Sequence, residues 1–227
     1  PILIKFDNVT KIYRDSTVLQ DISFEIKKGE FVSVVGKSGS GKTTLTRLIL
    51  GLEEPTGGQI FFEDINLCDV NSHKMQELRR RIGVVYQDYK LLPTKTVYEN
   101  VAYIMAVEGK PDSQIKSEVP KVLDIIGLTG KENNFPSELS GGEQQRLAIA
   151  RALVNHPDII IADEPTGNLD PYNTYEVISL LQKINAAGRT IILATHDREV
   201  INRLGKRVIT LEAGIIVRDE EAGRFII

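Results

Sequence analysis

Short apolar runs, separated by polar breaks, recur along this chain of 227 residues. Over the first thirty residues apolar and polar positions alternate, which predicts short antiparallel strands, and one more strand is expected over 60–62. Continuous apolar runs over 31–35, 159–162 and 190–194 are typical of parallel strands that are covered on both faces. The pattern therefore predicts an N-terminal antiparallel β subdomain and a separate parallel sheet.

Helical periodicity fills the segments between these runs. Helices are expected over 43–50, 145–154 and 172–186, and residues 83–87 have the pattern of another strand. From 88 to 152 the pattern is mostly helical, with glycine and proline breaks. Because strand, helix and strand follow one another along the chain, right-handed crossovers and an α/β fold are favoured.

We therefore expect one domain over 1–227. Its core would comprise 1–87 and 153–227, and residues 88–152 would form an inserted α-helical subdomain. A chain of this length is long enough to bury the core of one sizeable α/β domain.

Composition narrows the classes of function. A formal net charge of −3 argues against general nucleic-acid binding. No apolar stretch approaches the ~20 residues needed to span a bilayer, so a role at the membrane would require a partner protein. The single cysteine, Cys68, cannot form an internal disulfide, and the N-terminus is not signal-like. We therefore expect a protein of the reducing cytosol with a buried free thiol.

Residues 36–43 read GKSGSGKT and match the phosphate-loop pattern G-x-x-x-x-G-K-[ST]. They follow the apolar run 31–35 and precede the predicted helix 43–50. In that context the glycines let successive backbone N–H groups point at phosphate oxygens, and the positive end of the helix adds to the attraction. A plain glycine-rich turn is the alternative, and the flanking strand and helix argue against it.

Two acidic residues, Asp163 and Glu164, follow the strand predicted over 159–162, at the edge where ligands bind in open α/β sheets. There Asp163 would bind Mg²⁺ together with the Thr43 hydroxyl, and Glu164 would accept a proton from the attacking water or orient it. Gln87, at the end of another strand, could reach the metal or the γ-phosphate. The alternatives are an acidic pair that caps a helix and a glutamine on the surface.

A second glycine-containing segment, LSGGEQ over 139–144, precedes the predicted helix 145–154. Ser140 and Glu143 match a capping box, which explains a capped helix start. The two glycines between them go beyond capping, because they remove side chains from the positive end of the helix and allow a phosphate to approach. The chain therefore carries two helix ends suited to phosphate, about 100 residues apart.

These motifs, in this order, resemble the nucleotide-binding domain of ABC (ATP-binding cassette) proteins over nearly the whole chain. The resemblance rests on the phosphate loop, Gln87, LSGGEQ, the segment IIIADE at 159–164 and the segment ATHD at 194–197. It implies an α/β ABC-type nucleotide-binding domain with a P-loop parallel sheet core, an N-terminal antiparallel β subdomain and an inserted α-helical subdomain. It also implies ATP and Mg²⁺ as cofactors and ATP hydrolysis as the activity.

In that family two domains pair head to tail, with ATP between the phosphate loop of one and the LSGGEQ segment of the other. The resemblance therefore implies an ATP-dependent homodimer, in which Ser140 and Gly142 contact the γ-phosphate bound by the partner. Tyr13 would stack on adenine, and Asp170 would lie in the segment that links the two sites. His196 would hold the γ-phosphate and the water in place.

The resemblance implies which residues serve in catalysis, metal binding and nucleotide binding. The predicted catalytic residues are Glu164, His196, Lys42 and Gln87, and the predicted metal ligands are Thr43, Gln87 and Asp163. Nucleotide contacts are expected from Tyr13, Val18, Gly36, Lys37, Ser38, Gly39, Ser40, Gly41, Lys42, Thr43, Thr44, Gln87, Ser140, Gly142, Glu143, Asp163, Asp170 and His196.

The segments after Gln87 favour one bacterial branch of the family. QDYKLLP over 87–93, KTVYEN over 95–100 and GNLD over 167–170 resemble the ATPases of bacterial cell division, which act with a four-helix membrane protein of the FtsX type. This resemblance implies contact with that partner through residues 88–105 and a peripheral position on the cytoplasmic face of the cell membrane. It also implies signalling to cell-wall hydrolases.

Three alternatives stay open. The LLP and GNLD elements are shared with the ATPases of lipoprotein release and macrolide export, which work by the same mechanism. A soluble ABC ATPase that acts on ribosomes or DNA repair complexes usually has two cassettes or long inserted arms, and this chain has neither. A nucleotide-dependent binding module is disfavoured because Lys42, Asp163, Glu164 and His196 are all present. Without ATP we expect a monomer, because the implied interface contains the nucleotide.

Overall fold

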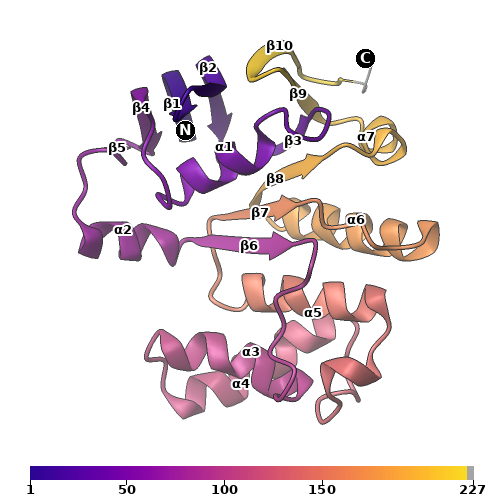
Figure 1. The fold of residues 1–227 in the computed structure, drawn as a ribbon. Coiled ribbons are helices and arrows are strands. Elements are labelled where there is room, and N and C mark those ends of the chain that lie inside the picture. The colour runs from indigo at the N-terminus through magenta and orange to yellow at the C-terminus, as the bar shows by residue number, and fades with distance from the viewer. Residues whose placement is uncertain (224–227) are drawn as a thin grey trace.

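Two β-sheets, with helices around them, form the molecule (Figure 1). The computed structural model describes residues 1–223, so the last four residues of the predicted domain, 224–227, lie outside the described part. Within residues 1–223 no helix combines the length and the hydropathy that crossing a membrane requires.

The smaller sheet is antiparallel, as the alternating pattern predicts. In spatial order its strands are β2 (Ser16–Lys27), β1 (Ile2–Tyr13), β4 (Gly57–Phe62) and β5 (Ile65–Asn66). Phe6 and Phe24 are paired across β1 and β2, and their rings stack with centroids 4.6 Å apart. This contact lies on the buried face, which explains why the apolar positions alternate.

The larger sheet is parallel except at one edge. Its strands, in spatial order, are β10 (Ile215–Glu220), β9 (Arg207–Glu212), β3 (Phe31–Val35), β8 (Thr190–Thr195), β7 (Ile159–Asp163) and β6 (Ile82–Tyr86). Only β10 runs antiparallel to its neighbour. Every residue of β3 and β8 is buried, which explains their continuous apolar runs. The predicted α/β fold is confirmed, whereas the edge hairpin β9–β10 was not predicted.

Helices are present in each segment where the sequence predicts them, and the helix over 198–204 was not predicted. They are α1 (Lys42–Ile49), α2 (Ser72–Arg79), α3 (Val97–Val107), α4 (Asp112–Ile125), the 3₁₀ helix η1 (Pro136–Glu138), α5 (Gly141–Leu153), α6 (Pro171–Ala186) and α7 (Arg198–Leu204). Helix α5 begins four residues before the predicted start at 145, because the Ser140 hydroxyl accepts a hydrogen bond from the Glu143 backbone N–H and caps the helix there. The glycine pair therefore lies in the first helical turn.

The larger sheet separates two hydrophobic cores. Val32 and Val34 of β3 pack in the core with α1 and the antiparallel sheet, whereas Phe31 and Val35 pack in the core with α3 to α6. Figure 1 shows the same arrangement, with α1 on one side of the parallel strands and α5 on the other. The first turn of α1 and the first turn of α5 therefore lie on opposite faces of the sheet.

Cys68 is exposed, so the expectation of a buried thiol is wrong. It lies just after β5, where the chain leaves the smaller sheet. In the turn that follows β5, the neighbouring apolar residue Leu67 is the one that is buried.

Candidate functional site

A cavity of about 350 Å³ lies at the carboxyl edge of the parallel strands. Its lining combines the segments that follow β3, β6, β7 and β8. The lining residues are Val18, Ser38, Gly39, Gly41, Lys42, Thr43, Thr44, Gln87, Glu164 and His196. In open α/β sheets ligands bind at this edge, so the cavity is the leading candidate for the functional site.

The loop between β3 and α1 wraps around the lysine that ends it. Lys42 Nζ donates to the carbonyl oxygens of Gly36 at 2.7 Å and Lys37 at 3.1 Å, and the side chain is only 7% exposed. Gly41 has a φ of 108°, and a Cβ there would lie 2.6 Å from Leu19 Cδ2, so only glycine fits. The loop is therefore closed tightly over the start of α1, with its backbone exposed to the cavity.

Lys42 is a cation with little solvation. Burial lowers its pKa, and the nearby carboxylates of Glu164 and Asp163 oppose that effect. Lys42 Nζ lies 3.8 Å from Glu164 Oε1, at the outer limit of an ion pair. An anion placed in the cavity would gain from a cation that the Glu164 carboxylate, at this distance, neutralises only in part.

Asp163 and Thr43 face one another across the same edge. Thr43 Oγ1 donates to Asp163 Oδ2 at 3.3 Å, which is a long hydrogen bond. Burial, and then the Glu164 charge, raise the pKa of the Asp163 carboxyl, while the Thr43 hydroxyl lowers it. A hydroxyl and a carboxylate at this spacing fit Mg²⁺, which is usually bound in phosphate sites by one or two protein oxygens together with the phosphates.

Glu164 and His196 form the closest pair in the cavity, with Glu164 Oε1 2.8 Å from His196 Nδ1. Glu164 has a φ of 48°, in the left-handed region that residues other than glycine rarely adopt. Its backbone N–H donates to the Ala194 carbonyl at 2.8 Å, which ties this conformation to β8. The strained backbone turns the carboxylate toward the cavity, and such strain is typical of functional sites.

Gln87 leaves β6 and enters the lining. Its Nε2 donates to Asn168 Oδ1 at 3.2 Å, which joins this strand end to the loop before α6. A Cβ at Gly167 would lie 2.6 Å from Gln87 Nε2, so this glycine leaves room for the glutamine side chain. The structure thus places the predicted glutamine at the site and supplies it with a partner.

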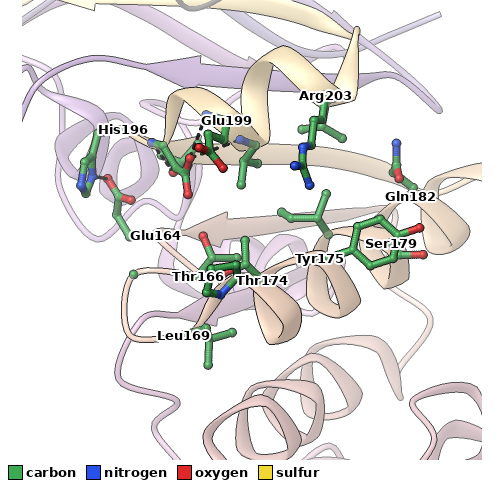
Figure 2. A pocket seen from close by; sticks show the side chains of 17 residues that line it. Glu164, Thr166, Leu169, Thr174, Tyr175, Ser179, Gln182, His196, Glu199 and Arg203 are labelled. Atoms are coloured by element: carbon green, nitrogen blue, oxygen red, sulfur yellow. Dashed lines mark hydrogen bonds and ion pairs between the residues drawn. The ribbon is translucent and has the colours of Figure 1, made fainter.

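A second cavity, of about 490 Å³, lies behind the Glu164–His196 pair (Figure 2). It runs between α6 and α7, and Arg203 and Gln182 line its far end. Glu164 and His196 line both cavities, so this pair forms part of the wall between them.

The LSGGEQ segment lies elsewhere. Ser140 and Glu143 form a reciprocal capping box at the start of α5, and Glu143 also pairs with Lys131. Gly142 packs against α6, where a Cβ would lie 1.9 Å from Asn173 Oδ1. Neither these residues nor Asp170 line the cavity at the phosphate loop, and the opposite placement of α1 and α5 explains why.

Tyr13 lies beside the cavity rather than in its lining. Its hydroxyl bonds to Glu53, Lys11 Nζ lies 4.9 Å from its ring centroid, and the residue is 37% exposed. The ring is therefore partly open to solvent, and its hydroxyl lies near Thr44, which lines the cavity.

Three predicted loop residues lie outside the cavity lining, and of these Lys37 is exposed and lines a neighbouring cavity beside β9. Ser40 is buried, and its hydroxyl has no hydrogen-bond partner among residues 1–223. Gly36 leaves no room for a side chain, because a Cβ would lie 2.4 Å from the Leu211 carbonyl oxygen. A glycine cradle, a buried lysine and a hydroxyl–carboxylate pair together fit a nucleotide phosphate chain with Mg²⁺.

Sequence reasoning missed three polar residues around the site. Asn168 holds Gln87, and Asn173 packs on Gly142 and donates to Asp170. Gln145 is fully buried and donates to the carbonyl oxygens of Tyr86 and Pro165, so it joins α5 to the ends of β6 and β7. No local pattern marks these residues, since their contacts with Gln87, Gly142, Tyr86 and Pro165 join segments distant in sequence.

Comparison with known proteins agrees with this geometry. Residues 19–167 match the family model described as ABC transporter. The chain is 49% identical over 224 residues to the cell division ATP-binding protein FtsE of Bacillus subtilis, covering 98% of each protein. It is also 46% identical over 200 residues to the methionine import ATP-binding protein MetN 1 of Listeria monocytogenes, covering 88% of this chain and 59% of that protein.

A solved structure shows the same fold. The dimeric post-hydrolysis structure of the ATP-binding cassette MJ0796, bound to ADP and Pi, superposes with a TM-score of 0.86. The two proteins are 36% identical, and the match covers 98% of this chain and 100% of the other.

Proposed function

Since this chain belongs to the ABC transporter family of ATP-binding proteins, we propose that it binds and hydrolyses ATP as the motor subunit of a membrane complex of the cell-division type. One observation carries the ATPase: Lys42, Glu164 and His196 converge on one cavity at the carboxyl edge of a parallel sheet. The similarity to FtsE over nearly the whole of both proteins supports the cell-division role.

ATP would bind with its phosphates on the loop of residues 36–43. The Lys42 ammonium, which now donates to two loop carbonyls, would exchange part of that bonding for stronger bonds to the β- and γ-phosphates. Tyr13 would stack on adenine with its exposed ring. Mg²⁺, held by Thr43 and Asp163 with Gln87 nearby, would neutralise charge on the phosphates when bound.

Hydrolysis would proceed by attack of a water on the γ-phosphate. The water oxygen bonds to phosphorus, the bond to the β-phosphate oxygen breaks, and the water proton passes to the Glu164 carboxylate. His196, 2.8 Å from that carboxylate, would orient it and hold the γ-phosphate. Gln87, anchored by Asn168, would complete the wall around the water.

A second copy of the chain would complete the site. Ser140, Gly142 and Glu143 lie on the other face of the sheet from α1, so they cannot reach the phosphates bound by their own chain. A head-to-tail pair would place them on the γ-phosphate of the partner, with Asp170 between the two sites. The similarity to a dimeric cassette supports this arrangement.

ATP binding would close this pair and hydrolysis would reopen it. Residues 88–105 would transmit this movement to an FtsX-type membrane protein. This segment follows Gln87, so it is connected directly to the nucleotide cavity. The chain would therefore lie on the cytoplasmic face of the bacterial membrane, and its ATP cycle would control cell-wall hydrolases on the other side.

A transport motor is the second candidate, supported by the 46% identity to a methionine import ATP-binding protein. Lipoprotein release and macrolide efflux belong to the same class. The chemistry at Glu164 would be identical in all of these, so only the membrane partner distinguishes them.

Affinity capture decides between the two. The Glu164→Gln protein, with ATP and Mg²⁺, is used to capture partners from detergent-solubilised membranes of its own host. A four-helix protein with one large outer loop, enriched at division sites, is the expected result. A permease of lipoprotein release, efflux or amino-acid import would overturn the cell-division role and leave the ATPase proposal intact.

A further inference from the structure

Tyr13, the residue proposed to stack on adenine, is tied to a glutamate in the turn after α1. Its hydroxyl donates to Glu53 Oε2, and Glu53 lies between the end of α1 and the start of β4. The Glu53 side chain is only 15% exposed. A carboxylate with so little access to water requires donors and cations around it, because leaving its charge unpaired would cost free energy.

Both oxygens of the Glu53 carboxylate are in use. Oε1 accepts from Arg47 Nε at 2.5 Å, and Oε2 accepts from the Tyr13 hydroxyl. Lys11 Nζ lies 3.6 Å from Oε2 and adds a second positive charge. The hydrogen bond from Tyr13 lowers the pKa of the Glu53 carboxyl most, burial opposes it, and Arg47 lowers it further. The carboxylate is therefore charged at neutral pH and holds three side chains together.

The bond to Arg47 joins this cluster to the helix that carries the phosphate loop. Arg47 follows Thr44 by one turn of α1, Thr44 lines the nucleotide cavity, and the Tyr13 hydroxyl lies near Thr44. Because Glu53 contacts both Tyr13 and Arg47, it sets the position of the ring relative to α1. It thereby sets the distance between an adenine on the ring and phosphates on the loop.

Lys11 covers one face of the same ring. Its Nζ lies 4.9 Å from the Tyr13 ring centroid and donates to the Glu54 carbonyl oxygen at 2.7 Å. The Lys11 side chain is 14% exposed, so its ammonium group is held in place. A cation over an aromatic face is attracted by the ring electrons, which strengthens this arrangement. A base can therefore stack only on the face that Lys11 leaves free, and the 37% exposure of Tyr13 provides room for it.

We propose that Glu53 is a positioning residue for the nucleotide, which holds the Tyr13 ring where adenine stacks while the phosphates lie on residues 36–43. Glu53 does not line the nucleotide cavity, so it acts through Tyr13. Without the carboxylate, ATP would have to order the ring as it binds, and that ordering would subtract from the affinity. This inference rests on the proposed function, because it assigns the residue that orients the proposed adenine contact.

Titration calorimetry of the full chain with two probes, ATP and inorganic tripolyphosphate, each with Mg²⁺, tests the inference. We expect Glu53→Ala to weaken ATP binding at least about fivefold, which is the lower end of what stacking of a base on an aromatic ring contributes. Tripolyphosphate contacts only the phosphate loop, so its affinity should be unchanged. In steady-state hydrolysis KM for ATP should rise while kcat stays at the wild-type value. A merely structural role would weaken the binding of both probes.

Two further variants make the test specific. Glu54→Ala removes the same charge one residue away, from an exposed side chain whose contact with Lys11 is made by the backbone, so ATP affinity should be unchanged. Tyr13→Phe keeps the ring and removes the hydroxyl that Glu53 holds, so it should weaken ATP binding about as much as Glu53→Ala. Because both changes break the same contact, the double variant should be no weaker than either single one. If Glu53→Ala does not fold, Tyr13→Phe carries the test.

The Tyr13→Ala protein separates failure of the inference from failure of the proposed function. Wild-type ATP affinity in Glu53→Ala and Tyr13→Phe, with weakened binding in Tyr13→Ala, would overturn the positioning role of Glu53 and leave the adenine contact intact. Equal weakening of ATP and tripolyphosphate in Glu53→Ala would also overturn the inference alone, since it would show a general disturbance of the loop. Unchanged affinity in Tyr13→Ala would overturn both the inference and the proposed adenine contact.

Discussion

His196 Nδ1 lies 2.8 Å from Glu164 Oε1, and the two side chains leave the ends of adjacent parallel strands. Because β7 and β8 are in register, the residues that follow them meet at one edge of the sheet. Glu164 also lies 3.8 Å from Lys42 Nζ, so one carboxylate faces an imidazole and an ammonium group. This placement separates Glu164 from Asp163, which faces Thr43 instead.

Changing Glu164 to Gln should stop turnover and preserve nucleotide binding. The amide keeps the shape of the side chain but cannot accept the proton of the attacking water, so we expect hydrolysis to fall by about 10²–10⁴-fold. An ATP-bound dimer should accumulate, because the step that reopens it is removed. Phosphate release and light scattering in ATP with Mg²⁺ measure the two effects.

Glu220→Gln provides the control for that variant, since Glu220 is exposed on β10, outside the cavity lining. It should turn over ATP at the wild-type rate and form no lasting dimer. Unchanged turnover in Glu164→Gln would remove Glu164 from the role of base.

Asp163→Asn should stabilise the nucleotide-free protein while abolishing its Mg²⁺-dependent turnover. The pKa of the Asp163 carboxyl is raised mainly by burial and then by the Glu164 charge, so its ionised form is disfavoured in the fold. A neutral amide that can still accept from Thr43 removes that cost. We expect Tm to rise by about 2–4 °C near pH 7, which corresponds to about 1 kcal/mol.

The pH dependence of this gain has a defined sign. A carboxyl whose pKa is higher in the folded than in the unfolded state lowers the free energy of unfolding. This cost is complete at pH values above the folded pKa and vanishes below the unfolded pKa, which is near 3.9. The difference in Tm between Asp163→Asn and the wild type should therefore be largest near neutral pH and should close as pH falls toward 4. Thermal unfolding across this range measures it, and a gain that grows with acidity would contradict the argument.

Gly142→Ala should disturb α6 through Asn173. The new Cβ would lie 1.9 Å from Asn173 Oδ1, so the amide must leave the position in which it donates to Asp170. Loss of one such hydrogen bond costs about 1 kcal/mol, or about 2–4 °C in Tm. The variant should also form less ATP-dependent dimer, because both Gly142 and Asp170 belong to the proposed interface.

A double-mutant cycle isolates this clash. Asn173→Ala removes the side chain that the new methyl group meets, so Gly142→Ala should cost less Tm in that background than in the wild type. An equal decrease in Tm in both backgrounds would show that a clash with Asn173 is not the reason why Gly142→Ala destabilises the fold.

Glu63→Gln should weaken the junction between the two sheets. Glu63 follows β4, and its carboxylate accepts hydrogen bonds from both Nη atoms of Arg81, each at 2.9 Å. Arg81 immediately precedes β6. The Arg81 and Lys28 side chains lower the pKa of Glu63 to about 2. Because the contact is partly exposed, we expect the variant to lose only about 1 kcal/mol of the free energy of unfolding at pH 7, or about 2–4 °C in Tm.

The sign of this effect with pH is opposite to that of Asp163→Asn. A carboxyl with a depressed folded pKa stabilises the fold above its ordinary value near 4.3, and that stabilisation is lost as pH falls through the folded value. The wild type should therefore lose its advantage over Glu63→Gln between about pH 4 and about pH 2. Thermal unfolding in that range provides the measurement, and a constant difference would exclude the ion pair as its source.

Much of the fold follows from local patterns in the sequence. Strands such as 31–35 and 190–194 are recognisable because burial on both faces favours apolar residues at nearly every position. The start of α5 was assigned too late, since two glycines in its first turn lower helix propensity, although the capping box of Ser140 and Glu143 was recognised. The hairpin β9–β10 was missed because its outer strand is mostly exposed and its apolar residues end at Val217, so no alternating or continuous pattern extends over the strand.

The sequence alone determined which residues are candidates for the chemistry and in what order they follow one another along the chain. Lys42, Asp163, Glu164 and His196 each follow a strand or open a helix, so a local pattern marks them, and the order of parallel strands brings them to one edge. Tertiary structure alone decided that Asn168 holds Gln87 and that Asn173 packs on Gly142. It also decided that α5 starts on the face opposite to α1. The physical reason is that periodicity records only whether a residue is buried, whereas the partner of a polar side chain depends on how distant segments pack.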